Sequence, residues 1–293
     1  MNLQEMEHKS IAYRRTILKM IKNARAGHTG GSLSCIDLLN VLYNGVMNVS
    51  PENFHSPDRD RYIQSKGHSV EALYAVLAER GFFDPADLDT LCRYGSHYVG
   101  HPTRKVNGIE HNTGALGHGL SVGVGMALAA RMDSRAYRVF VLLGDGELAE
   151  GSNWEAAMSA AHYHLDNLVV IVDRNRLQIS GSTEEVTGLE PLAEKFSAFG
   201  FCVRSVDGHN LAELMRVFHQ VPFETGRPNL IMAQTIKGKG VRIAENAVEW
   251  HHHVPTDGEY AAAMAELDLQ EARLSEPPLS EPPPGESLQG APL

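Results

Sequence analysis

The sequence is poor in cysteine, in long apolar runs and in basic residues. Its three cysteines are widely spaced and form no CxxC pair, so we expect neither a disulfide framework nor a zinc motif, and a reducing cytoplasm is favoured. No stretch approaches the roughly 18 apolar residues typical of a membrane-spanning helix. A net charge of −10 argues against general nucleic-acid binding, which depends on Lys and Arg neutralising phosphate.

Two familiar motifs are also missing. No GxGxxG follows an apolar run at a helix start, which argues against a dinucleotide-binding protein. The N-terminal segment carries charges throughout and lacks the apolar core of a signal peptide. Histidine, by contrast, is abundant, with 15 residues, and several of them stand beside glycines rather than on apolar faces. Such histidines are candidates for binding or proton transfer.

Apolar runs alternate with helical patterns between residues 61 and 235. This alternation predicts an α/β fold in which a parallel sheet is flanked by helices. Strands are expected at 61–64, 137–143, 167–172, 201–206 and 229–235. Helices are expected at 3–26, from an N-cap at Ser34 to Tyr43, at 69–80, 85–94, from His118, at 152–163, 189–199 and 210–220.

The predicted sheet belongs to one domain, residues 1–257. A C-terminal helix is expected at 258–275, and the Pro-rich segment 276–293 is expected to be disordered. Segment 95–117 is rich in Gly and His and has no periodicity. Loops of that length in compact domains are usually functional or disordered, and we expect a functional loop because predicted packed elements flank it.

Polar residues follow two of the expected strands at the point where each strand ends. Asp145 comes directly after the run that stops at Gly144, and Asn175 follows the run that ends near Val172. The carboxyl ends of neighbouring parallel strands lie side by side, at the edge where open α/β sheets bind ligands. A carboxylate, an amide and a nearby carbonyl are hard oxygen ligands that suit Mg²⁺. Gly146 allows close approach of a phosphate, so the sequence predicts a magnesium–diphosphate site.

Several ordered blocks carry a family resemblance. GDG at 144–146 followed by Asn175 is similar to the thiamine-diphosphate signature, and the flanks GDGELAEGSNWEA and DRNRLQISG look like its transketolase version. Agreeing blocks are GHTGGSLS at 27–34, SKGHSVEALY at 65–74, GHPTRKVNGIEHNTGALGHGLSVGVGMALA at 100–129, TIKGKG at 235–240 and WHH at 250–252. The chain therefore resembles transketolase over roughly residues 10–255. This resemblance implies a thiamine-diphosphate-binding fold, with thiamine diphosphate and Mg²⁺ as cofactors.

The resemblance also implies roles for individual residues. Asp145, Asn175 and the Leu177 carbonyl are expected to bind Mg²⁺. The residues expected to contact the cofactor are His68, His251, Gly146, Asn175 and the backbone of Gly114, Ala115 and Leu116. The residues expected to be catalytic are His28, His101 and His251, which would exchange protons with a sugar phosphate, and Glu150, which would hydrogen-bond toward a partner's catalytic glutamate.

Other polar residues near these blocks are given more ordinary interpretations. Glu147 and Glu155 are expected to cap or solvate the helix that follows. Lys237 and Lys239 are equally consistent with turn charges and with a site role. GHTGG stands where many family members have GHPG, and WHHH where WHG is common, so His252 and His253 could alter the rim of the substrate pocket.

The largest departure from the family is length. A full transketolase continues with a pyrimidine-binding and a C-terminal domain, and the glutamate that activates the cofactor comes from that part. The layout here is similar to the N-terminal subunit of a split transketolase. The resemblance therefore implies a second subunit, an α₂β₂ assembly, and ketol transfer from a ketose phosphate to an aldose phosphate.

Two alternatives stay open at this point. A dehydrogenase E1 component or another thiamine-dependent synthase subunit shares GDG and the later Asn, but should lack the set His28, His101 and His251. A non-catalytic, thiamine-diphosphate-binding regulatory subunit is the second alternative, against which the intact site residues argue.

Overall fold

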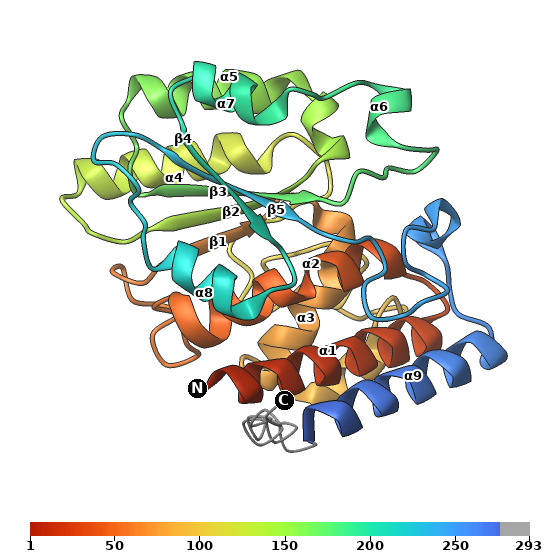
Figure 1. The fold of residues 1–293 in the computed structure, drawn as a ribbon. Coiled ribbons are helices and arrows are strands. Elements are labelled where there is room, and N and C mark those ends of the chain that lie inside the picture. The colour runs from red at the N-terminus through yellow and green to blue at the C-terminus, as the bar shows by residue number, and fades with distance from the viewer. Residues whose placement is uncertain (276–293) are drawn as a thin grey trace, which may run out of the picture.

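A single parallel sheet lies at the centre of the computed structural model, which describes residues 1–275. Its five strands follow the order β1-β2-β3-β5-β4, and every neighbouring pair is parallel. The strands are β1 (Arg61–Gln64), β2 (Val139–Gly144), β3 (Leu168–Arg174), β4 (Cys202–Asp207) and β5 (Asn229–Gln234). Helices cover both faces of the sheet (Figure 1), which confirms the predicted α/β fold.

The central strands are apolar along their length because both of their faces are covered. Every residue of β2 and β3 is buried. Successive side chains of a strand point to opposite faces, so Phe140 and Leu142 join one hydrophobic core while Val139 and Val141 join the other. This double burial explains why the strands appear in the sequence as continuous apolar runs.

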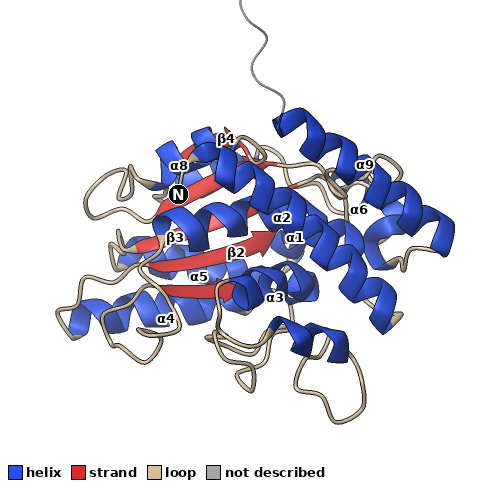
Figure 2. Ribbon diagram, turned by 90° about the horizontal axis from the view of Figure 1, so that it is seen from below, coloured by secondary structure: helices blue, strands red, loops and turns tan. Residues whose placement is uncertain are grey.

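The larger core lies between the sheet and the helices on one face (Figures 1 and 2). These helices are α1 (Leu3–Ala24), α2 (Thr29–Val41), α3 (Val70–Glu79), α8 (Leu211–Phe218) and α9 (Asp257–Ser275). Helix α2 is buried at every position, and a short π-helix, Leu42–Val46, continues it. Helix α9 lies along α1, where Arg15 forms ion pairs of 2.7 Å with Asp268 and 2.6 Å with Glu271.

The other face is covered by α4 (Gly119–Met132), α5 (Gly151–His162) and α7 (Leu192–Ala198) (Figure 1). Helix α4 approaches β2 closely because it carries small residues. A Cβ placed on Gly123 would lie 2.5 Å from Cγ2 of Val141. The short helix α6 (Thr183–Val186), which the sequence pattern did not reveal, follows the end of β3.

Two predicted helix boundaries are wrong. Helix α2 begins at Thr29 rather than at Ser34, because Gly30 and Gly31 allow close packing instead of ending the helix: a Cβ on Gly30 would lie 2.8 Å from the Trp250 carbonyl. The helix expected at 85–94 is a 3₁₀ helix that ends at Thr90, and Cys92 adopts a positive φ of 56° that helices do not tolerate.

Segment 91–118 forms neither helix nor strand, and side-chain contacts hold it in place. Thr113 Oγ1 donates to the Gln64 carbonyl at 2.7 Å, and Arg59 pairs with Glu110 at 2.5 Å. At the other end of the chain, the predicted disorder at 276–293 lies outside the described residues. Within residues 1–275, the apolar stretches of the helices are all too short or too polar to cross a bilayer.

Candidate cofactor and substrate site

A cavity of about 410 Å³ opens at the carboxyl ends of the strands. This volume falls within the range of about 300–1,000 Å³ that is usual for small-molecule sites. The cavity brings together residues from all of the family-like blocks. Those of the predicted set that line it are His28, His68, Gly114, Leu116, Asp145, Gly146, Asn175, Leu177 and His251.

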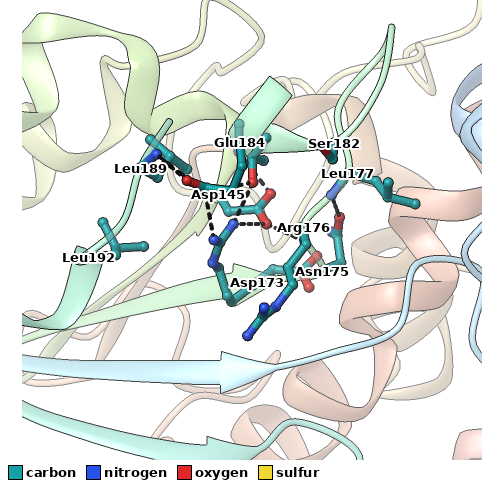
Figure 3. Close-up of polar contacts among 12 residues, drawn as sticks. Asp145, Asp173, Asn175, Arg176, Leu177, Ser182, Glu184, Leu189 and Leu192 are labelled. Atoms are coloured by element: carbon teal, nitrogen blue, oxygen red, sulfur yellow. Dashed lines mark hydrogen bonds and ion pairs between the residues drawn. The ribbon is translucent and has the colours of Figure 1, made fainter. Parts of the chain in front are cut away.

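The hydrogen-bond ladder between β2 and β3 sets the position of Asp145. Gly144 is paired with Asp173, and the next backbone amide, that of Asp145, donates to the Asp173 carbonyl at 3.3 Å. The Asp145 carboxylate then accepts from its neighbour Gly146 N at 2.8 Å. It also accepts from Arg176 N at 2.5 Å (Figure 3). The aspartate that follows β2 therefore reaches the turn that follows β3, as predicted.

The turn after β3 carries the other two predicted metal ligands. Arg176 adopts a left-handed conformation with φ of 66°, and this reverses the chain. Asn175 Oδ1 accepts from Leu177 N at 3.1 Å (Figure 3). Asn175 Nδ2 lies 3.4 Å from Ser34 Oγ. Ser34 lies inside α2, so the central helix helps to orient the amide.

A small hairpin closes this side of the cavity. Leu177 and Ser182 form an isolated antiparallel bridge, and Gln178 N donates to the Gly181 carbonyl at 3.0 Å. Ile179, at the tip, lines the cavity and yet is 73% exposed. Gly146 faces the hairpin so closely that a Cβ there would lie 2.6 Å from Gln178 Oε1, which explains the glycine at this position.

Buried charges gather at one side of the cavity, which we call the charged side: Lys66 and Asp145 line it, and Asp173 and Arg174 are their ion-pair partners. Lys66 forms an ion pair with Asp173, and both side chains are buried. Burial opposes the charge on each, but their attraction prevails, so the pKa of Lys66 is raised and that of Asp173 is lowered. Ser34 and Thr235 also donate to Asp173. The hydrogen bond from Ser34 to Asp173 joins the end of β3 to α2.

Arg174 connects the same region to α6. Its guanidinium lies 3.1 Å from Asp145, 3.0 Å from Glu184 and 2.9 Å from Glu190. Burial, followed by the charge of Asp173, raises the pKa of Asp145, whereas the contacts with Arg176 N and Arg174 oppose this. A carboxylate in such a setting gains from a nearby divalent cation.

Glu147 is a site residue that the sequence interpretation missed. It was expected to cap or solvate α5, but it is 2% exposed and lines the cavity. Its carboxylate accepts from Gly117 N at 2.9 Å, from Gly144 N at 3.0 Å and from Ser65 Oγ. Burial raises its pKa. The carboxylate thus holds the loop that carries Gly114 and Leu116 against the end of β2.

Five histidines gather at another side of the cavity, which we call the histidine side: His28, His68 and His251 line it, and His101 and His252 contact His28. His28 lies at the centre, with ring centroids 4.6 Å from His252, 5.3 Å from His68, 5.5 Å from His251 and 6.1 Å from His101. The Nδ1 atom of His28 is buried without a hydrogen-bond partner among the described residues. These rings come from the start of α2 at Thr29, the 3₁₀ helix Gly67–Ser69, the loop 91–118 and the 3₁₀ helix Val248–His252.

Burial keeps four of these histidines, His28, His68, His101 and His251, uncharged. Burial, followed by the charge of His252, lowers the pKa of His28 to about 4. Burial, followed by Lys237, lowers the pKa of His251 to about 3, and burial also lowers the pKa values of His68 and His101. These four imidazoles are therefore neutral near pH 7, with one nitrogen that donates and one that accepts.

Lys237 stands between the two sides. It is 2% exposed, and its Nζ lies 2.9 Å from Nδ1 of His251 and 3.4 Å from the Leu177 carbonyl. Burial, followed by the charge of Lys66, lowers its pKa to about 8. Of the two interpretations weighed for this lysine, the geometry favours a site role. Lys239 instead lies at 3.7 Å from Glu245.

Three predicted site residues lie outside the lining of the cavity. His101 reaches the site through its ring contact with His28, and a Cβ on Gly114 would lie 2.9 Å from it. Ala115 stands between the lining residues Gly114 and Leu116. Glu150 is exposed and precedes α5, so it faces solvent in the single chain.

The donor set suits the predicted metal. Among residues 1–275, no group of three or more His, Cys, Asp or Glu side chains could hold a metal ion. The predicted set needs only one such side chain, since Asn175 and the Leu177 carbonyl supply neutral oxygens, and all three line the same cavity. Hard oxygen donors beside buried cations are the chemistry that a magnesium diphosphate requires.

The fold and the cavity together define an α/β cofactor-binding domain with its site at the carboxyl edge of a parallel sheet. A family model described as "Transketolase, thiamine diphosphate binding domain" matches residues 6–273. The chain belongs to this family. The predicted transketolase class and thiamine diphosphate as the cofactor are therefore confirmed.

Curated relatives include chains of similar length. An apulose-4-phosphate transketolase subunit from Phocaeicola vulgatus is 48% identical over 267 residues, which cover 91% of this chain and 95% of that one. The 6-deoxy-6-sulfo-D-fructose transketolase subunit SqwG of a Clostridium species is 42% identical, covering 92% of this chain and 98% of that one. Both names describe subunits of transketolases, which supports the predicted two-chain transferase.

Solved structures of transketolases share the fold. The Campylobacter jejuni enzyme superposes with a TM-score of 0.81 at 29% identity, over 94% of this chain and 48% of that one. This chain therefore spans about half the length of the solved transketolase that it matches.

Proposed function

We propose that this chain is the diphosphate-binding subunit of a two-chain transketolase that moves a two-carbon ketol unit from a ketose phosphate to an aldose phosphate. The observation that carries the proposal is the convergence of Asp145, Asn175 and Leu177 with His28, His68 and His251 on one cavity. The subunit names of the relatives support the division into two chains.

The charged side of the cavity is suited to the cofactor's anionic end. Asp145, Asn175 and the Leu177 carbonyl would hold Mg²⁺, while His68, His251 and Gly146 would meet the diphosphate. The backbone of Gly114, Ala115 and Leu116 would meet the edge of the aminopyrimidine. Thiamine diphosphate, when bound, supplies the electron sink for breaking and forming a carbon–carbon bond. In this arrangement the chain provides position and charge.

The histidine side is suited to a polyhydroxylated substrate. His28, His101 and His251 are neutral near pH 7, so each can donate one hydrogen bond to a hydroxyl or carbonyl oxygen and accept another. A ring nitrogen that accepts can also take the proton of a substrate hydroxyl while the bond beside it breaks. These rings would thus orient the sugar and move its protons without adding charge.

The subunit names of the relatives support a second subunit, which would supply the family's cofactor-activating glutamate. We propose an α₂β₂ assembly in the cytoplasm in which the partner covers the cavity. Glu150 is exposed at the start of α5, where it could hydrogen-bond to a glutamate of the partner.

The test is to purify the chain alone and together with a pyrimidine-binding second subunit, and to measure ketol transfer with Mg²⁺ and thiamine diphosphate. We expect cofactor binding and turnover only in the two-chain sample, with a ketose phosphate as donor. Substantial turnover by the single chain would contradict the split assembly. Consumption of pyruvate instead of a ketose phosphate would contradict ketol transfer and favour an E1-type subunit.

A further inference from the structure

A buried carboxyl group lies behind His28, and no cation of the described chain balances it. Glu71, the second residue of α3, has no exposed surface. Among residues 1–275, no Lys, Arg or His side chain forms an ion pair with it. Its contacts are of another kind: Oε1 accepts from the backbone N–H of His28 at 3.1 Å, and Oε2 accepts from Ser32 Oγ at 2.8 Å.

These two contacts fix the turn that presents His28. The two hydrogen bonds hold the chain at His28, just before α2, and at Ser32, in its first turn. Gly27, just before the histidine, has a φ of +150°, and a Cβ there would lie 2.7 Å from Glu71 Oε1. The turn contains threonine where a proline could have locked the backbone. Its geometry therefore depends on the carboxyl group and on the absence of a side chain at Gly27.

The same turn is tied to the segments that carry the other polar residues of the cavity. Thr29 Oγ1 donates at 2.6 Å to the carbonyl of His253, two residues after His251. Gly238 N donates to the Gly30 carbonyl at 3.0 Å, next to Lys237. A shift of the turn would consequently move His28 relative to both His251 and Lys237.

We propose that Glu71 is a positioning residue: its carboxyl group holds the 27–32 turn so that the His28 imidazole points into the cavity on the histidine side, where the substrate would bind. This inference rests on the proposed function, because it assigns the positioned ring to substrate. Glu71 itself lines neither the cavity nor the cofactor position. It acts only through the backbone of the turn.

Packing alone does not account for a carboxyl group at this position. A buried acid without a cation destabilises the fold, and a neutral side chain of the same shape would avoid that cost. Burial raises the pKa of Glu71 to about 7, although the hydrogen bonds from Ser32 and His28 oppose this. The titratable groups that face it are His28, Cys35, Tyr74 and Cys92, and burial raises the pKa values of the last three.

The decisive comparison is Glu71→Ala against Glu71→Gln in the two-chain enzyme. The glutamine keeps an acceptor for His28 N and can donate to Ser32 Oγ, whereas alanine removes both contacts. We expect Glu71→Ala to lower kcat/KM for the ketose donor by about 10- to 100-fold, since small misplacements of a substrate-orienting group cost that much. Glu71→Gln should stay within about threefold of wild type, and both variants should bind thiamine diphosphate within about twofold of wild type because the cofactor side is separate.

Glu79→Ala is the matched control, because Glu79 ends the same helix and contacts Lys9 and Tyr13 far from the cavity. It should leave the donor kcat/KM unchanged. The proposal is overturned if Glu71→Ala keeps the wild-type donor kcat/KM, or if it lowers thiamine diphosphate affinity and thermal stability together with activity while Glu71→Gln fails to rescue any of them.

A second readout does not depend on catalysis. In the full chain labelled with ¹⁵N-histidine, the backbone amide of His28 should shift between pH 5.5 and 8.5 as Glu71 titrates, and this shift should disappear in Glu71→Gln. The His28 ring, with a pKa of about 4, titrates outside that window. A His28 amide that is insensitive to pH in wild type overturns the inference even if ketol transfer is found. A titrating amide in a chain that lacks ketol transfer overturns the proposed function instead.

Discussion

The two sides of the cavity hold polar groups in opposite ways. On the charged side, Lys66 is paired with Asp173 and Asp145 with Arg174, so buried charges neutralise one another. On the histidine side, burial keeps His28 and His251 uncharged, and no carboxylate within residues 1–275 pairs with either ring. The difference teaches that one cavity can offer fixed charge to a metal diphosphate and neutral hydrogen-bonding groups to a sugar. Glu71 is the exception, as a buried acid beside the uncharged rings.

The largest effect is expected when an ion pair of the charged side is removed, because this tests whether that side depends on neutralised charges. Lys66→Met should lower the free energy of unfolding by about 3–5 kcal/mol, because it leaves the buried Asp173 carboxylate without its cation. Urea unfolding measures this loss. The control Lys9→Met removes an ion pair at the surface and should cost less than about 1 kcal/mol. Equal losses in the two variants would show that the charged side does not depend on its pairing.

The buried acid on the other side gives the next largest effect. The pKa of Glu71 is raised from 4.5 to about 7 in the fold, so the folded protein holds this proton more tightly than the unfolded chain does. The contribution of this proton to the free energy of unfolding is fully present below pH 4.5 and is lost as the pH rises through 7. Glu71→Gln removes this loss. Its free energy of unfolding should rise relative to wild type by about 2–3 kcal/mol between pH 5 and pH 8. Parallel stability profiles of the two proteins over this range, measured by chemical unfolding, would contradict the raised pKa.

The affinity for thiamine diphosphate is expected to depend on the charged side of the cavity. Asp145→Asn should weaken magnesium-dependent binding of thiamine diphosphate by about 100-fold, the upper end of what lost metal-site contacts cost. Titration calorimetry measures the affinity, and a thermal melt shows whether the variant is folded. Asp133→Asn, an exposed aspartate at the end of α4, is the control and should bind as wild type does. Unchanged affinity in Asp145→Asn would remove the basis for the metal site.

The smallest effect is expected at the rim of the histidine side. His252 is exposed and lies 4.6 Å from His28, so it can touch a bound sugar without touching the cofactor. His252→Ala should change the ratio of kcat/KM between two donor ketoses by about 5- to 10-fold, the range of a single pocket contact. Thiamine diphosphate affinity should stay the same. The exposed His219, after α8, provides the alanine control, and equal ratios in both variants would exclude a role in specificity.

Much of the fold and part of the site could be predicted because the signals were local or periodic. Buried parallel strands produce continuous apolar runs, so β2 and β3 were recognisable, and their ends placed Asp145 and Asn175. The family-like blocks identified His28, His68 and His251, which the structure brings to one cavity.

The remaining site residues depend on contacts that no local pattern records. Glu147 resembles a helix-capping glutamate in sequence, and only the fold turns it inward onto Gly117 and Ser65. Glu71 looks like an ordinary helical residue until α2 is placed beside it. The glycines at 30 and 31 similarly suggest the end of a helix, whereas the packing of Trp250 against Gly30 shows why the helix runs through them. Lys66 and Lys237 stood inside the family-like blocks, which was a usable signal.

The pairing of Gly144 with Asp173 has a consequence for how this chain can vary. A single inserted or deleted residue within either strand would turn Asp145 or Asn175 to the opposite face of the sheet. The segment between β2 and β3, which contains α5, can vary in length, because its length does not determine how Gly144 pairs with Asp173. Changes in the length of the surface connections around α5 should therefore leave the geometry of the proposed metal site intact, whereas the strands themselves must keep their length.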